Sequence, residues 1–203
     1  MLIHYVITKK ALMEKALGQA GYGWIRFSLN KDGTEIIASA PLGKSLEECV
    51  TAINESFRLG NEILSQILTD NMTDLEKIQA AYRYITENVT YDFRYYTDHS
   101  NMPYESMVAL GALQDNLAIC GGYAQSFEAL LDMLQIENYT VSGKSHRENH
   151  MWNYVVLDGK GYYCDPTADH GGRNNYFMLS EKEITANRGY SWDSSFLKKI
   201  SEK

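Results

Sequence analysis

Three residues of the types that perform nucleophilic catalysis follow one another in a short part of the chain: Cys120, His150 and Asp165. A thiol attacks an amide carbonyl only as thiolate, and an ordinary cysteine with a pKa of about 8.5 is mostly protonated at neutral pH. A neighbouring imidazolium can stabilise the thiolate, and a carboxylate can fix the tautomer of the imidazole. The order of the three residues therefore predicts a thiol enzyme.

The expected position of Cys120 is the start of a helix. An apolar stripe at i, i+3, i+4 and i+7 predicts a helix over residues 121–134: Phe127, Leu130, Leu131 and Leu134. A helix N-terminus favours an adjacent anion by about 0.3–1 kcal/mol, which is less than one pKa unit. His150 must therefore supply most of the stabilisation of a thiolate. Gly121 and Gly122 are expected to let a substrate approach the backbone closely.

The period of the apolar residues changes to two after this helix, which predicts strands over residues 139–143, 150–157, 161–165 and 175–179. Asp158-Gly159 is typical of a type I′ hairpin turn between the second and third of these strands. In that register His150 and Asp165 share one face, about 7–8 Å apart diagonally, within reach of a hydrogen bond. Trp152 lies on the same face, where it either shields the site or fills the core.

The first part of the chain predicts smaller elements. Residues 10–19 are expected to form a helix, and residues 24–29 and 35–40 two strands, which gives an αββ-like segment. Three capping boxes predict three further helix starts, at Ser45/Glu48, Thr73/Glu76 and Ser180/Glu183.

The helix expected to start after Ser45 should run through Leu68, with Gly60 weakening its middle. Its buried face is expected to consist of Leu46, Val50, Ile53, Phe57, Leu64 and Ile67. Residues 91–119 are expected to wall a cleft, with a short helix over residues 106–113.

These elements predict an α+β fold with one main core. We expect an N-terminal extension over residues 1–72, a catalytic core over residues 73–190 and a polar C-terminal tail over residues 191–203. The three cysteines are too few and too scattered for a disulfide framework, and Cys49 and Cys164 are expected to be buried.

The net charge of −7 disfavours general binding to nucleic acid or to an anionic membrane surface. No apolar run has the length of a membrane-spanning helix, and residues 1–10 lack the pattern of a signal peptide. We therefore expect no membrane insertion. The compartment stays open between the cytoplasm and, for a fragment of a longer precursor, the cell surface or the medium, and the oligomeric state is open as well.

The motifs around the three residues resemble the core of bacterial transglutaminase-like proteins, which belong to the papain-like superfamily of cysteine enzymes. The resemblance covers roughly residues 73–180 and rests on Cys120-Gly-Gly-Tyr-Ala, Gly143, His150-Met-Trp-Asn153, Asp158-Gly159 and Tyr163-Cys-Asp-Pro-Thr167. Two positions depart from the pattern: Gly121 stands where many relatives have an acidic or polar residue, and Met151 replaces a small residue.

The resemblance implies a nucleophile helix packed on an antiparallel sheet, with Cys120 as nucleophile, His150 as acid and base and Asp165 as the orienting carboxylate. It implies acyl transfer or hydrolysis at peptide or glutamine amide bonds, and hydrolysis is favoured. The expected partner is a peptide or protein substrate, cell-wall peptides included, and no cofactor is expected. The alternative is a catalytically silent surface or scaffold domain that binds peptide or glycan.

Two further assignments are disfavoured. A metal site formed by His146 and His150 is disfavoured, because residues four apart on a strand lie about 13 Å from each other; Asp165, Asp169 or His170 would have to complete it. Gln114 lies six residues before Cys120 and could donate to an oxyanion, but a surface glutamine is the favoured interpretation.

Overall fold

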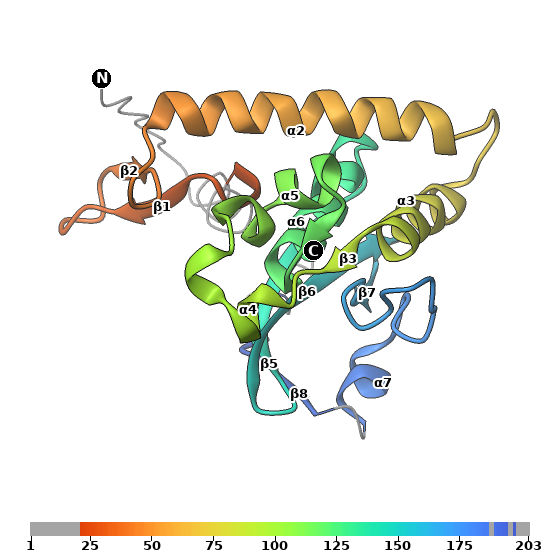
Figure 1. The fold of residues 1–203 in the computed structure, drawn as a ribbon. Helices are drawn as coiled ribbons and strands as arrows, with labels where there is room; N and C mark the ends of the chain where they lie inside the picture. The colour runs from red at the N-terminus through yellow and green to blue at the C-terminus, as the bar shows by residue number, and fades with distance from the viewer. Residues whose placement is uncertain (1–20, 187–188, 195–196, 198–203) are drawn as a thin grey trace.

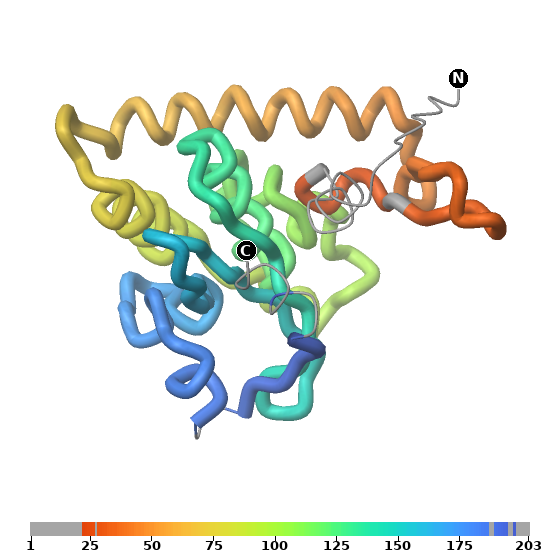
Figure 2. Tube along the Cα trace, turned by 180° about the vertical axis from the view of Figure 1, so that it is seen from behind, coloured from red at the N-terminus to blue at the C-terminus, as the bar shows by residue number. Residues whose placement is uncertain are grey.

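The computed structural model describes residues 21–186, 189–194 and 197. Its elements in chain order are η1 (Gly21–Gly23), β1 (Arg26–Leu29), β2 (Ile36–Ser39), α2 (Leu46–Ile67), α3 (Asp74–Asn88), β3 (Thr90–Tyr91), α4 (Arg94–Thr97), η2 (His99–Asn101), η3 (Tyr104–Met107), α5 (Ala109–Gln114), β4 (Leu117–Ala118), α6 (Cys120–Met133), β5 (Asn138–Ser145), β6 (Glu148–Leu157), β7 (Lys160–Cys164), α7 (Glu181–Thr185) and β8 (Tyr190–Ser191). Helix α2 crosses one edge of the molecule, and the sheet that contains β5 and β6 lies away from it (Figure 1). The view from behind shows the same arrangement (Figure 2). The predicted α+β class is confirmed.

Strands β1 and β2 form the antiparallel hairpin that the sequence predicted near the N-terminus. The side chain of Asn30 closes its turn, because Oδ1 accepts hydrogen bonds from the backbone N–H groups of Thr34 (2.9 Å) and Glu35 (3.3 Å). In such a turn, the side-chain oxygen takes the place of the backbone carbonyl as hydrogen-bond acceptor. The helix expected over residues 10–19 lies outside the described residues.

Helix α2 begins at the predicted capping box. The N–H of Glu48 donates to Ser45 Oγ (3.1 Å), and the N–H of Ser45 donates to Glu48 Oε2 (2.7 Å). The helix is continuous through Gly60, which does not bend it into two pieces. A Cβ at Gly60 would lie 2.5 Å from Met133 Cε, so the missing side chain lets α2 lie close to α6.

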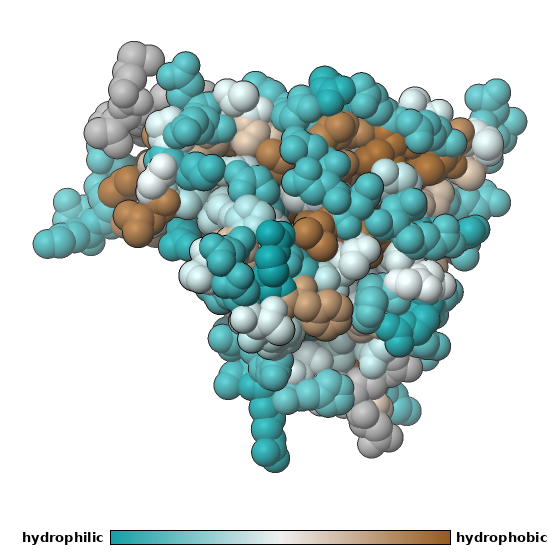
Figure 3. Space-filling model, in the orientation of Figure 1, coloured by the Kyte–Doolittle hydropathy of each residue, from teal (hydrophilic) through white to brown (hydrophobic). Residues whose placement is uncertain are grey.

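The predicted buried face of α2 was partly wrong. Val50 is 46% exposed and Phe57 is 37% exposed, and Figure 3 shows hydrophobic residues at the surface along this helix. The side chains that face the core are mainly small, and they include Cys49, Ala52 and Ser56. Small residues allow the helix axes to approach, which the apolar periodicity alone does not encode.

Helix α6 is the central element, since it contacts α2, α3, α5 and strands β5 and β6. It begins at Cys120, one residue before the predicted start. Three residues of its predicted apolar stripe, Phe127, Leu130 and Leu131, are fully buried, whereas the fourth, Leu134, follows the helix as its C-cap and is half-buried. The chain thus surrounds its candidate nucleophile helix with packed elements on several sides.

The first turn of α6 packs directly on the backbone of η3. A Cβ at Gly122 would lie 2.7 Å from Ala118 Cβ and 2.9 Å from the carbonyl oxygens of Ser106 and Val108, and one at Gly121 would lie 2.5 Å from the carbonyl oxygen of Met107. Both glycines are buried. The expectation that they let a substrate approach the backbone is therefore corrected. Their missing side chains leave room for the neighbouring backbone instead.

The sheet has the strand order β7-β6-β5-β8, with antiparallel neighbours throughout. In the β6–β7 hairpin, paired residue numbers sum to 317, which is the register that the sequence predicted. Asp158 (φ 51°) and Gly159 (φ 71°) both have positive φ, as a type I′ turn requires. The parity that puts His150 and Asp165 on one face is therefore present.

The fourth predicted strand, residues 175–179, is not a strand. Only Leu179 forms a bridge, to Tyr163, with backbone hydrogen bonds of 2.7 and 2.8 Å. Met178 has a φ of 51°, and its N–H donates to Cys164 Sγ (3.3 Å) rather than to a neighbouring strand. A left-handed residue cannot continue an extended ladder, so the segment only follows the edge of β7.

Two apolar clusters share the sheet. The larger one joins α2, α3, α5 and α6 to one face, and the smaller one, on the other face, includes Trp152, Tyr154, Tyr190 and Leu197. Cys49 and Cys164 are both buried, as expected. None of the helices in the described ranges is long and apolar enough to cross a membrane.

We predict that Gly122→Ala lowers the free energy of unfolding by about 1–2 kcal/mol. Overpacking against a backbone costs about 1–3 kcal/mol, and the better helix propensity of alanine offsets up to about 1 kcal/mol of that. Urea unfolding followed by circular dichroism measures the change. Gln79→Ala, at an exposed position of α3, is the control and should stay within about 0.5 kcal/mol of the parent. Equal stability of Gly122→Ala and the parent would show that η3 can move away from the added methyl group without loss of stability.

Candidate active site

Cys120 is the first residue of α6 and is partly exposed. The residue before it, Ile119, has extended backbone angles and provides no side-chain cap, so no capping side chain occupies the first N–H groups of the helix. The N–H of Ile119 donates to the carbonyl of Ser106 (2.8 Å), and the short parallel pair β3–β4 holds the residues just before it. The thiol is thus fixed at the positive end of a helix dipole.

His150 and Asp165 are in contact. His150 Nε2 lies 2.6 Å from Asp165 Oδ2, a distance typical of a charge-assisted hydrogen bond. His150 lies on β6, and Asp165 follows the last residue of β7. The side chain of Cys120 interacts electrostatically with the same imidazole. The three predicted site residues are therefore brought together, with the imidazole in the middle.

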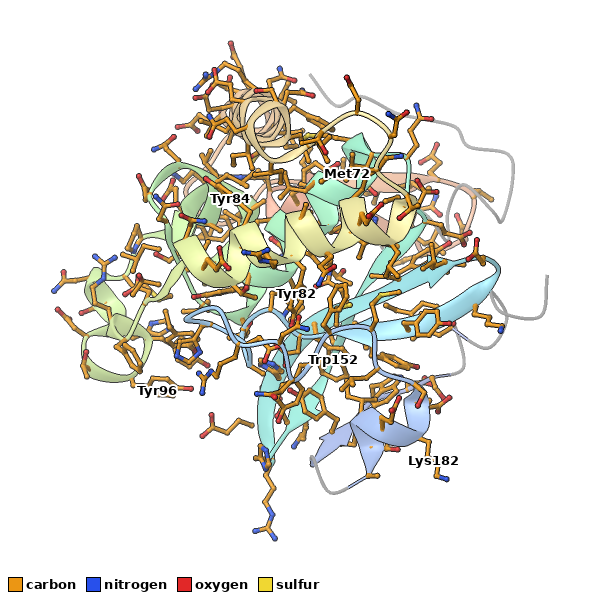
Figure 4. All side chains as sticks on the ribbon, turned by 90° about the vertical axis from the view of Figure 1, so that its right-hand side faces the viewer. Met72, Tyr82, Tyr84, Tyr96, Trp152 and Lys182 are labelled. Atoms are coloured by element: carbon orange, nitrogen blue, oxygen red, sulfur yellow. The ribbon has the colours of Figure 1, made fainter. Side chains whose placement is uncertain are left out.

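Asn153 and Tyr82 lock the elements that bear these residues. Asn153 Nδ2, fully buried on β6, donates to the carbonyl of Ala124 on α6 (2.9 Å), which ties the histidine strand to the cysteine helix. The hydroxyl of Tyr82, on α3, lies 3.0 Å from the carbonyl oxygen of Asp165 and 2.6 Å from Asp169 Oδ2. Figure 4 shows Tyr82 on the side of α3 that faces the sheet.

The carboxylate of Asp165 is fully buried and has three hydrogen-bond donors. Oδ1 accepts from the N–H of Ala168 (3.0 Å), and Oδ2 accepts from His150 and from the hydroxyl of Tyr190. Sequence reasoning did not identify Tyr190. Its only signal was an aromatic residue in a segment rich in tyrosine and tryptophan, and nothing in the local pattern pointed to Asp165.

The charges of this group favour the imidazolium. Burial of the ring opposes protonation, but the hydrogen bond with Asp165, the interaction with the Cys120 side chain and the negative charges of both groups raise the pKa of His150 to about 10. A pKa raised above the unfolded value of about 6.5 stabilises the fold fully below that pH. This contribution is lost as the pH rises through about 10.

Trp152 both shields the site and fills the core. It is fully buried, its ring stacks on His150 at 5.9 Å between centroids, and it meets Tyr190 edge to face at 5.1 Å. Figure 4 shows it at the sheet, below α3 in that view. The ring excludes water from one side of the imidazole, which strengthens the hydrogen bonds there.

The segment after α3 approaches Cys120 from another direction. Tyr91 interacts electrostatically with Cys120 and packs against Phe93 and Tyr96. Asp92, the residue after Tyr91, is buried. Hydrogen bonds from Arg94, the larger effect, and from Ser106 lower its pKa to about 2. Tyr91 and Met107 of this segment therefore lie near the first turn of α6, and a cleft walled by residues 91–119 stays a prediction.

Gln114, His146 and His170 lie outside the contacts that join Cys120, His150 and Asp165. Gln114 is exposed and its Nε2 donates to Asp115 (3.3 Å). His146 has a φ of 50° in the turn between β5 and β6, and His170 Nδ1 lies 2.9 Å from the carbonyl of Thr167. Within the described part of the chain, no group of three or more His, Cys, Asp and Glu residues is arranged to hold a metal ion.

A model of one protein family, the transglutaminase-like superfamily, matches residues 61–166. This chain belongs to the transglutaminase-like superfamily. A solved structure, a crystal structure of a TGase, has the same fold, with a TM-score of 0.52, 18% sequence identity and coverage of 93% of this chain and 55% of that one.

Two curated relatives match as well. The chain is 27% identical over 165 residues to the kyphoscoliosis peptidase of Mus musculus, covering 74% of this chain and 23% of that protein. It is 26% identical over 123 residues to the kyphoscoliosis peptidase of Homo sapiens, covering 55% and 18%. The chain thus spans less than a quarter of the length of these relatives of the superfamily.

The electrostatics of the site predict that His150 does not titrate between pH 6 and 8. The imidazolium is retained until the pH approaches about 10, whereas a solvated histidine loses its proton near 6.5. NMR titration of the histidine ring protons, assigned with His150→Gln, measures this. In Asp165→Asn, which removes the anion but keeps the shape, the pKa of His150 should fall by at least one unit. A wild-type His150 that titrates near 6.5 would contradict the interpretation.

Proposed function

We propose that this chain is a cysteine enzyme that cleaves peptide or related amide bonds through Cys120, His150 and Asp165. The observation that carries the proposal is the partly exposed thiol at the start of α6, which interacts electrostatically with an imidazole that itself binds a buried carboxylate. Imidazolium and helix dipole together favour the thiolate, which the dipole alone cannot.

The reaction follows from the positions of these groups. The Cys120 thiolate attacks the amide carbonyl carbon, and the carbonyl oxygen becomes an oxyanion. The backbone N–H of Cys120 is our candidate donor to that oxygen, because a helix start presents unpaired N–H groups. The C–N bond then breaks, the His150 imidazolium protonates the departing amine, and a thioester remains.

The second half-reaction decides between hydrolysis and transamidation. For hydrolysis, neutral His150 removes a proton from water, the water oxygen attacks the thioester, and the carboxylic acid leaves as the thiol reforms. An amine in place of water gives a new amide. We favour hydrolysis, because the relatives with matching sequences are named peptidases.

Exposed aromatic rings on the segment that contains Tyr91 support a peptide or protein as substrate. Phe93 is 61% exposed, Tyr96 59% and Tyr95 37%, on the segment that contains Tyr91. Aromatic side chains are enriched where proteins bind one another, since they bury a large area with little loss of rotamer entropy. Cell-wall peptides fall within this substrate class.

Thiol labelling tests the state of Cys120 without a substrate. We predict that iodoacetamide alkylates Cys120 at a rate that stays on a plateau from about pH 5 to 8, because the thiolate persists there. In His150→Ala the rate should instead rise with the titration of a thiol near pH 8.5. Peptide mass spectrometry locates the label, and the buried Cys49 and Cys164 serve as internal controls. A native Cys120 that does not react would favour the catalytically silent binding domain.

Turnover of peptide and glutamine–amine libraries tests the reaction itself. We predict that Cys120→Ala lowers kcat/KM by roughly 10⁴-fold or more, as removal of a covalent nucleophile does, whereas Cys49→Ala keeps the parent activity. With an amine present, mass spectrometry should find mainly the hydrolysed product. A dominant amide-exchange product would assign transamidation, and undiminished turnover by Cys120→Ala would remove the thiol from the mechanism.

A further inference from the structure

The hydroxyl of Tyr190 donates to Asp165 Oδ2, the same oxygen that binds His150. We propose that Tyr190 is a positioning residue of the active site, which keeps the buried Asp165 carboxylate directed at His150. The inference rests on the proposed function, because it extends the Cys120, His150 and Asp165 relay by one group.

The sheet sets the position of Tyr190. Strand β8 pairs with the end of β5, with Tyr190 opposite Ser145, and the N–H of His146 donates to the carbonyl of Gly189 (3.1 Å). Tyr190 is only 7% exposed. Its ring meets His150 edge to face at 6.0 Å between centroids. The hydroxyl is therefore held in one orientation, in which it points at the Asp165 carboxylate.

The chemistry of a buried carboxylate gives this contact its function. Burial favours the neutral acid, and each hydrogen bond donated to the carboxylate favours the anion. Asp165 is fully buried, and apart from the imidazole its carboxylate accepts from the N–H of Ala168 and from Tyr190. Loss of the Tyr190 hydroxyl leaves Oδ2 with His150 as its single donor. A carboxylate that is held less firmly pairs less well with the imidazolium, which in turn stabilises the thiolate less.

The other titratable groups around Asp165 do not replace Tyr190. The Tyr82 hydroxyl, from α3, contacts the main-chain carbonyl of Asp165 and the carboxylate of Asp169. Cys164 and Asp169, from the segment of Asp165 itself, are buried, and Cys164 Sγ accepts from the N–H of Met178. Burial first, and the charge of Asp165 second, raise the pKa of Tyr190 far above the physiological range, so its hydroxyl remains a donor.

The pH profile of Cys120 alkylation tests the proposal, since a purely structural role would not move it. In Tyr190→Phe, which keeps the ring, the acidic limb of the profile should shift upward by about one pH unit, the effect of one hydrogen bond to a charged group. With a substrate, kcat should fall while KM stays near its parent value. Tyr154→Phe is the matched control: it removes the hydroxyl of another buried tyrosine in the same cluster, one that lies against Gly161 and away from Asp165, and should leave the profile unchanged.

A second variant keeps the test decisive if Tyr190→Phe folds poorly. Replacement of Tyr190 by 3,5-difluorotyrosine keeps ring and hydroxyl but makes the hydroxyl a stronger donor, and the acidic limb should move downward. The role of Tyr190 is overturned if the acidic limb of the alkylation profile is unchanged in both Tyr190 variants. It is also overturned if the limb shifts by the same amount in Tyr154→Phe. A parent protein without a low-pH plateau overturns the proposed function instead, so the two failures are distinguishable.

Discussion

The rest of the site depends on the burial of one charge. The Asp165 carboxylate is fully buried, and a buried charge without partners costs several kcal/mol. Its donors come from separate parts of the chain: His150 on β6, Tyr190 on β8 and the N–H of Ala168 in the following loop. Each of the three donors offsets part of the cost of burying this carboxylate. Its satisfaction therefore links the closing of the sheet to the orientation of the imidazole.

The second constraint is the distance between the helix of Cys120 and its neighbours. Gly122 brings α6 onto the backbone of η3, and Gly60 brings α2 close to Met133 at the other end of α6. Asn153 then fastens β6 to the carbonyl of Ala124. A misplacement of about 1 Å can cost two orders of magnitude in rate, so packing that fixes the helix also fixes the proposed chemistry. The same packing around α6 therefore stabilises the fold and sets the geometry of the site.

Local patterns predicted local structure well. The capping boxes at Ser45 and Thr73 start helices where expected, because each is a reciprocal bond between residues three apart. The hairpin at Asp158-Gly159 has the predicted register, because two positive φ angles fix it. The failures concern long-range packing. Nothing in the periodicity of α2 showed that small side chains would face the core, and residues 175–179 alternate like a strand but follow β7 with a left-handed residue at Met178.

By itself the sequence determined which residues could perform thiol chemistry and that His150 and Asp165 share a face, since strand parity and turn type are local properties. It also placed Cys120 at a helix start. Two features were decided by the tertiary structure alone. The Tyr190 hydroxyl donates to the Asp165 carboxylate, and the glycines after Cys120 let α6 pack on the neighbouring backbone. These contacts join segments distant in sequence, whose approach depends on the complementary shapes of whole elements. No spacing between residues encodes such complementarity.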